Sequence, residues 1–192
     1  MNEIEEKAVQ EKKTLGFWIY LMTDCILFAS LFATFAVLRT ATAGGPSGAD
    51  LFDLDFVLAE TMILLASSFT TGLAILGVAR GFKKQTIFWL GVTFALGATF
   101  LALEITEFNH LVAEGNGWDR SAFLSAFFTL VATHGLHITV GLLWLAIMII
   151  RLVRYNFKKT DLNRLALFGL FWHFLDVVWI FVFSIVYLIG GM

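Results

Sequence analysis

Residues 172–179 read WHFLDVVW, which places a histidine and a carboxylate inside an apolar stretch that extends from about Leu165 to Ile189. The stretch is long enough to cross a bilayer as a helix, for which about 20 residues are needed. A carboxylate at the centre of such a helix costs roughly 2.5–3.5 kcal/mol on insertion. His173 and Asp176 are three residues apart, so they share one helix face and can pair with each other or with a neighbouring helix. We therefore predict a membrane protein with a polar interior.

The composition of the whole chain supports a helical membrane protein. Its 192 residues are 59% hydrophobic and 15% charged, and the mean hydropathy is +0.83, well outside the range of soluble globular proteins. Strands of a membrane β-barrel would be about 10 residues long and would alternate in polarity, which these segments do not. We predict an all-α integral membrane protein with a five-helix bundle as its single membrane domain, residues 15–192, after an N-terminal tail of residues 1–14. The expected helices span about residues 15–38, 56–79, 87–108, 122–150 and 165–189.

The basic residues predict how the helices are oriented. Eleven of the 13 Lys and Arg fall in the N-terminal tail and in the loops near residues 80–84 and 151–164. Only Arg39 and Arg120 fall on the other side. The positive-inside rule then places the N-terminus in the cytoplasm and the C-terminus on the periplasmic side. Because the basic residues follow the topology and the net charge is −2, we expect no nucleic-acid partner.

Other features limit the class of protein further. The first apolar stretch is too long for a signal-peptide core and contains Asp24, so we expect no cleaved signal peptide. The single cysteine, Cys25, excludes a disulfide framework or a cysteine-rich metal site, and we expect it to be a small core residue. No predicted loop exceeds about 17 residues, which leaves no room for a soluble catalytic domain.

Ionisable residues occur at two depths in the predicted helices. Such residues usually face the interior of the bundle or a partner, and each is a functional hypothesis by default. The group near the middle of the helices comprises Asp24, His134, His137, His173 and Asp176. The group near the outer ends comprises Glu60, Glu104 and Glu107, with His110 at the boundary.

Two cofactor hypotheses follow from these residues. Glu107-x-x-His110 matches the motif that di-iron carboxylate bundles use twice, together with two further glutamates, but here it occurs once. A haem could instead be ligated axially by two histidines on facing helices. His134 or His137 with His173 is the deep combination that the sequence offers.

Two further hypotheses need no cofactor. Chains of Asp, Glu and His suit proton translocation, although the five helices lack the inverted repeats that are common in transporters. The remaining hypothesis is a structural polar network, which the residues alone favour. Asp24 lies at a membrane depth similar to that of the deep histidines, so it is a plausible neighbour of one of them. Glu60 is a plausible neighbour of Glu104 for the same reason. Two carboxyl groups at such short range are expected to share a proton.

Two histidine-containing runs carry a family resemblance. THGLH at residues 133–137, followed by Gly141, and WHFLDVVW at residues 172–179 are together similar to subunit III of the haem–copper terminal oxidases. The resemblance extends through residues 16–24 and 103–108 and covers nearly the whole chain beyond the first 14 residues. Subunit III of cytochrome c oxidases commonly has seven helices, whereas five helices resemble the quinol-oxidising branch. The runs at residues 20–25 and 42–46 are most similar to the bo-type ubiquinol oxidases.

The resemblance implies a role and a set of partners. Such a complex lies in the bacterial inner membrane, where it oxidises ubiquinol, reduces dioxygen to water and pumps protons. Its haems and copper sit in catalytic subunit I, so this multi-pass chain is expected to hold no metal, no redox cofactor and no catalytic residue. It would stabilise subunit I, contact other subunits, bind phospholipid and support proton uptake. The alternative is a free-standing membrane haem or proton carrier. The expected polar-network and lipid-contact residues are Asp24, Glu60, Glu104, Glu107, His134, His137, His173 and Asp176.

Overall fold

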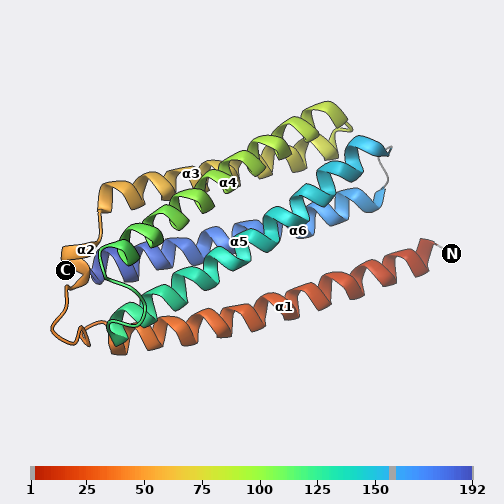
Figure 1. Ribbon diagram of the computed structural model, residues 1–192. Coiled ribbons are helices and arrows are strands. Elements are labelled where there is room, and N and C mark those ends of the chain that lie inside the picture. The colour runs from red at the N-terminus through yellow and green to blue at the C-terminus, as the bar shows by residue number, and fades with distance from the viewer. Residues whose placement is uncertain (1–2, 156–158, 192) are drawn as a thin grey trace.

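The chain folds into a bundle of long helices, shown in Figure 1 by a computed structural model that describes residues 3–155 and 159–191. No strand occurs among the described residues. Within this described part of the chain, five helices are long and apolar enough to span a membrane, which confirms the five predicted helices. The elements are α1 (Glu3–Leu38), the short α2 (Gly48–Leu51), α3 (Leu54–Ala79), α4 (Lys83–Ala113), α5 (Ala122–Arg154), α6 (Lys159–Val182) and the π-helical η1 (Phe183–Ile189).

The helix ends differ from the sequence-based expectation in two places. Helix α1 begins at Glu3 rather than near residue 15, so the predicted tail extends the first helix. The Glu, Lys, Gln and Ala residues of this segment are good helix formers, which explains the extension. At the other terminus α6 widens into η1, where the Gly190 N–H bonds to the carbonyl of Ile185, five residues earlier, at 3.1 Å. Hydropathy and helix length carry no signal for this π turn.

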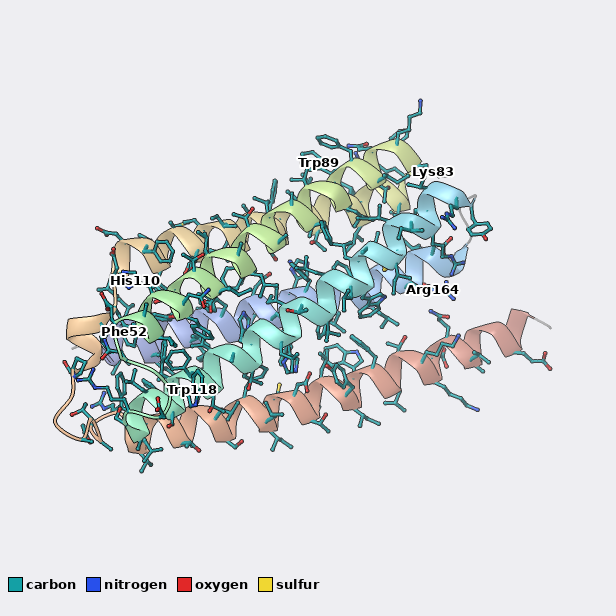
Figure 2. The ribbon with its side chains drawn as sticks, viewed as in Figure 1. Phe52, Lys83, Trp89, His110, Trp118 and Arg164 are labelled. Carbon is teal, nitrogen blue, oxygen red and sulfur yellow. The ribbon has the colours of Figure 1, made fainter. Side chains whose placement is uncertain are left out.

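Helices α3, α4, α5 and α6 form a closed ring in which each packs against the next and α6 returns to α3. Helix α1 lies outside the ring, against α5 and the adjoining side of α6 (Figure 1). The α3–α4 and α5–α6 connections lie at the same end of the bundle as the N-terminus, and the C-terminus lies at the opposite end. Figure 2 shows Lys83 and Arg164 at the N-terminal end and His110 and Trp118 at the other. Of the basic residues used for orientation, Lys158 lies outside the described residues, as do the side chains of Lys7 and Lys159.

Two glycines allow α4, α5 and α6 to meet around one indole. Trp172 of α6 is fully buried. A Cβ atom added at Gly97 would lie 2.9 Å from Cη2 of Trp172, and one added at Gly141 would lie 2.9 Å from its Cζ3. Small residues at such positions let transmembrane helices approach closely. The centre of the bundle is therefore packed around a tryptophan rather than around a cavity.

The expectation that Cys25 is a core residue is wrong, because Cys25 is exposed on α1. Helix α1 touches the bundle along a single stripe. Leu21, Asp24, Phe28 and Phe35 are buried there, at the three- and four-residue spacing of one helix face. Cys25 follows Asp24 and so lies to one side of this stripe. An outlying helix buries one face only, which its uniform hydropathy does not reveal.

Candidate functional site

The intramembrane polar residues lie in separate clusters rather than in one continuous network. One cluster joins α1 to α5, a second joins α3 to α6, and a third joins α3, α4 and η1 near the outer end. A buried histidine of α5 stands apart from all three. The members are Asp24 with His137; Ser68 with His173 and Asp176; Glu60 with Glu104, Glu107 and Tyr187; and His134 alone.

Asp24 and His137 form the contact between α1 and α5. Nε2 of His137 lies 3.5 Å from Oδ2 of Asp24, and Nδ1 of His137 lies 2.7 Å from the carbonyl oxygen of Thr133. A carbonyl oxygen only accepts hydrogen bonds, so Nδ1 carries a proton and donates it to Thr133. The other nitrogen, Nε2, faces the Asp24 carboxyl group, so a hydrogen bond between the two would require one proton on either atom.

His173 and Asp176 form the second cluster together with Ser68. Nδ1 of His173 lies 2.5 Å from Oγ of Ser68 and 3.7 Å from Oδ2 of Asp176. The 3.6-residue period of α6 places the histidine and the carboxylate on one face, and α3 supplies the serine. The Asp176 side chain is only 6% exposed, whereas that of His173 is 46% exposed. The cluster therefore begins in the core and ends on the surface of the bundle.

Three glutamates meet near the outer end of the bundle. Glu60 of α3 and Glu104 and Glu107 of α4 place carboxyl oxygens within 4.8 Å of one another. Tyr187 of η1 donates its hydroxyl to Oε2 of Glu107 at 3.2 Å. Among the described residues, no basic side chain forms an ion pair with these glutamates. Three negative charges at this range are unfavourable in an apolar interior, so shared protons or a cation must neutralise them.

The glutamates are close enough to hold a metal ion, and carboxylate oxygens suit a hard cation such as Mg²⁺, Ca²⁺ or Mn²⁺. The di-iron hypothesis, however, also required the histidine of Glu107-x-x-His110 as a ligand. The His110 side chain is 71% exposed and contacts Glu114 at 3.6 Å instead. The structure does not bring His110 into the cluster, so this motif is not assembled as a metal site.

The histidine environments do not fit a haem. His134 is fully buried, and neither of its ring nitrogens has a hydrogen-bond partner. Its ring centroid lies 5.2 Å from that of Trp179, 6.0 Å from that of Phe100 and 6.4 Å from that of Phe28. These rings fill the space that a porphyrin would need. His137 is already engaged on both nitrogens, so these side chains do not form a bis-histidine pocket.

Sequence reasoning missed the hydroxyl partners that fix α6 against α3. Nε1 of Trp172 donates to Oγ of Ser67 at 2.9 Å, and Nε1 of Trp179 donates to Oγ1 of Thr61 at 3.0 Å. The two indoles are seven residues apart and share a face of α6, and a buried indole N–H usually finds an acceptor. The seven-residue spacing could have predicted that both indoles donate to the same neighbouring helix. It could not have predicted which residues accept, because that depends on which helix packs beside α6.

Comparison with known proteins gives a consistent result along the chain. The family described as cytochrome c oxidase subunit III matches residues 2–191. Cytochrome bo(3) ubiquinol oxidase subunit 3 of Pseudomonas aeruginosa is 58% identical over 177 residues, which is 92% of this chain and 85% of the relative. The protein of the same description from Pseudomonas putida is 60% identical over 176 residues, with the same coverage of both chains. Quinol oxidase subunit 3 of Bacillus subtilis is 46% identical over 176 residues, 92% of this chain and 86% of the relative.

Substitutions at Asp24 test the shared proton. Asp24→Asn retains an N–H that can donate to Nε2 of His137, so we expect a loss in stability below about 1 kcal/mol. Asp24→Leu removes every partner of that nitrogen and should destabilise by about 1–3 kcal/mol, the penalty for an unsatisfied buried polar group. Thermal unfolding of the purified protein in mild detergent measures both variants. Equal effects of Asn and Leu would contradict the proton assignment.

Glu60→Gln tests how the glutamate cluster is neutralised. If protons do so, an uncharged amide should leave stability unchanged or raise it, because it removes one acid and adds donors to the neighbouring carboxyl oxygens. Asp55→Asn, at an exposed carboxylate of the same helix, is the control and should shift stability by no more than about 0.5 kcal/mol. Thermal unfolding again gives the comparison. A loss greater than about 1 kcal/mol with Glu60→Gln would show that a cation or a basic partner holds the charge.

Proposed function

The chain belongs to the cytochrome c oxidase subunit III family, and from this premise we propose that it is subunit III of a proton-pumping, bo-type ubiquinol oxidase. In this role it has no catalytic residue and no redox cofactor, and the haems and copper lie in catalytic subunit I. It stabilises that subunit and supports the uptake of protons from the cytoplasm. The observation that carries the proposal is the match over residues 2–191, together with relatives of the same description at 58% and 60% identity.

The polar clusters support a structural role rather than a catalytic one. Asp24 and His137 attach the outlying helix α1 to α5, and Ser68 and His173 join α3 to α6. His134 fills an aromatic cage. Each of these groups has a role in packing or pairing within the chain. The intramembrane polar residues then act on the complex through the placement of the helices and through local charge. They are Asp24, Glu60, Glu104, Glu107, His134, His137, His173 and Asp176.

The proposed location is the bacterial inner membrane, with the N-terminus in the cytoplasm and the C-terminus in the periplasm. The connections that carry Lys83 and Arg164 lie at the same end of the bundle as the N-terminus (Figure 2). The positive-inside rule assigns that end to the cytoplasm. The glutamate cluster then lies towards the periplasmic face, and Asp24, His137 and His173 lie near the middle of the bilayer.

A cavity at the cytoplasmic end supports the proposed binding of phospholipid. It has a volume of about 150 Å³ and lies between α3, α5 and α6, with Ile147 and Leu165 among its apolar lining residues. Asp161 pairs with Arg151 at 3.1 Å and with Arg164 at 4.0 Å, and the Arg164 side chain is 52% exposed. A basic rim above an apolar floor suits a phosphate head group with acyl chains below it.

The proposal is tested by purifying the chain in mild detergent from its native membrane. A reduced-minus-oxidised spectrum is recorded before and after the chain is separated from co-purifying proteins. We expect haem bands that leave with a larger partner, which mass spectrometry should identify as the catalytic subunit. Haem bands that stay with the isolated chain would contradict the proposal, favour a free-standing haem carrier and make His134, His137 and His173 the ligands to test.

A further inference from the structure

The glutamate cluster near the outer end of the bundle contains buried oxygen atoms to which no described residue donates a hydrogen bond. Glu60 is fully buried, and neither Oε1 nor Oε2 of its carboxyl group has a partner among the described residues. Glu104 is 3% exposed, and its Oε1 has none either. Buried polar atoms in proteins nearly always have a partner, so each exception needs an explanation, such as a bound ion.

The carboxyl groups of the cluster converge on one place. Glu60, Glu104 and Glu107 each bring a carboxyl oxygen within 4.8 Å of the other two. A Ca²⁺–oxygen bond measures roughly 2.3–2.6 Å, so two oxygens on opposite sides of the ion are about 4.6–5.2 Å apart. Each carboxyl group has two oxygens, and together the three groups reach the lower limit of about six ligands that Ca²⁺ takes. The three side chains can therefore supply the ligands of one ion.

The donor atoms select the class of cation. Carboxylate oxygens suit Mg²⁺, Ca²⁺ and Mn²⁺, whereas softer metals prefer thiolate or imidazole ligands. The imidazole of His110, one turn beyond Glu107, is 71% exposed and contacts Glu114 instead of the cluster. Mg²⁺ gives up its water reluctantly and usually keeps several water ligands, whereas Ca²⁺ accepts carboxylates in a flexible geometry. A buried cluster of carboxyl groups therefore favours Ca²⁺.

Tyr187 and Glu107 supply the remaining features that such a site needs. One Ca²⁺ ion leaves a single negative charge on three ionised carboxylates. The buried hydroxyl of Tyr187 donates to Oε2 of Glu107 at 3.2 Å, and a hydrogen bond to an ionised acceptor stabilises such a charge. Glu107 is half-buried, so one member of the cluster is accessible from the surface. Helix α4 ends at Ala113, which places Glu107 about 9 Å from that end.

We propose that Glu60, Glu104 and Glu107 form a Ca²⁺-binding site at the outer end of the bundle. The ion links α3 to α4, and the hydrogen bond from Tyr187 joins η1 to the same site. In the absence of a cation the acids hold protons. Ca²⁺ releases these protons to the solvent when it binds, because carboxylate ligands must be deprotonated. All of the ligands belong to this chain, so the site goes beyond the proposed function and requires no partner subunit.

Equilibrium binding of radiolabelled Ca²⁺ tests the site on the full chain, purified in mild detergent with the subunits it retains and freed of metal by a chelator. Concentrations of about 10⁻⁵ to 10⁻² M include the range in which extracellular Ca²⁺ sites bind. We expect Glu60→Gln to weaken the binding of one ion per chain by about tenfold or more, a loss seen even when a group that only supports a metal ligand is removed. Asp55→Asn, at an exposed carboxylate of α3, is the control and should match the wild type.

Thermal unfolding of the same preparations gives a second readout. A ligand that binds only the folded chain raises Tm. We expect Ca²⁺ to raise Tm of the wild type and of Asp55→Asn, and not that of Glu60→Gln. In chelator, Glu60→Gln should unfold at the wild-type temperature or above it, which also shows that this variant folds. Glu107→Gln changes the half-buried member of the cluster and should lose the Ca²⁺ effect as well, so it replaces Glu60→Gln if that variant does not fold.

Three results would overturn the Ca²⁺ site. The first is a wild-type chain that binds no more Ca²⁺ than Glu60→Gln. The second is an equal loss in Asp55→Asn, which would show that Ca²⁺ is attracted by the acidic surface at this end of the bundle. The third is displacement of the label by Mg²⁺ or Mn²⁺ at lower concentrations than by unlabelled Ca²⁺. Whether a haem-bearing subunit co-purifies decides the proposed function separately, because the difference between wild type and Glu60→Gln belongs to this chain.

Discussion

The helix arrangement depends on one constraint, which is that a polar group at bilayer depth is stabilised when it pairs within the protein. Water is absent there, and an unpaired group costs several kcal/mol. His134, Glu60 and Asp176 are exceptions, because their buried side-chain nitrogen and oxygen atoms have no hydrogen-bond partner among the described residues. Asp24 meets the constraint with His137 and so attaches α1 to α5. The indoles of Trp172 and Trp179 meet it with hydroxyl groups of α3. The same contacts that satisfy the polar groups therefore set which helices are neighbours.

Two of the four histidines, both on α5, are already surrounded by groups of the protein. Both nitrogens of His137 are engaged by Thr133 and Asp24, and His134 is enclosed by aromatic rings. The glutamate cluster stands apart, because its acids meet one another rather than basic partners among the described residues. Membership of the cytochrome c oxidase subunit III family agrees with such a chain acting inside a larger oxidase.

Length and hydropathy were sufficient to predict the five helices, because a membrane fixes the length of a span. Counting depth along each span correctly placed Asp24 beside a histidine and Glu60 beside Glu104. The sequence could not predict which helices lie side by side, and so could not predict the partners that neighbouring helices supply. The partners Ser68 and Tyr187 depend on helix order and on the π turn of η1, and Cys25 points outward because α1 buries only one face. His110 was considered as a ligand of a metal motif, yet its side chain is 71% exposed and contacts Glu114 instead.

The central claim is that the histidines of this chain serve the fold and not a cofactor. The most direct test is the haem and copper content of intact oxidase complexes that carry His134→Phe, His137→Gln or His173→Gln, each expressed per catalytic subunit. The account predicts the wild-type haem and copper ratio in every variant, even where the yield of complex falls. A variant complex that has lost one haem per catalytic subunit would contradict it and would make that histidine an axial ligand.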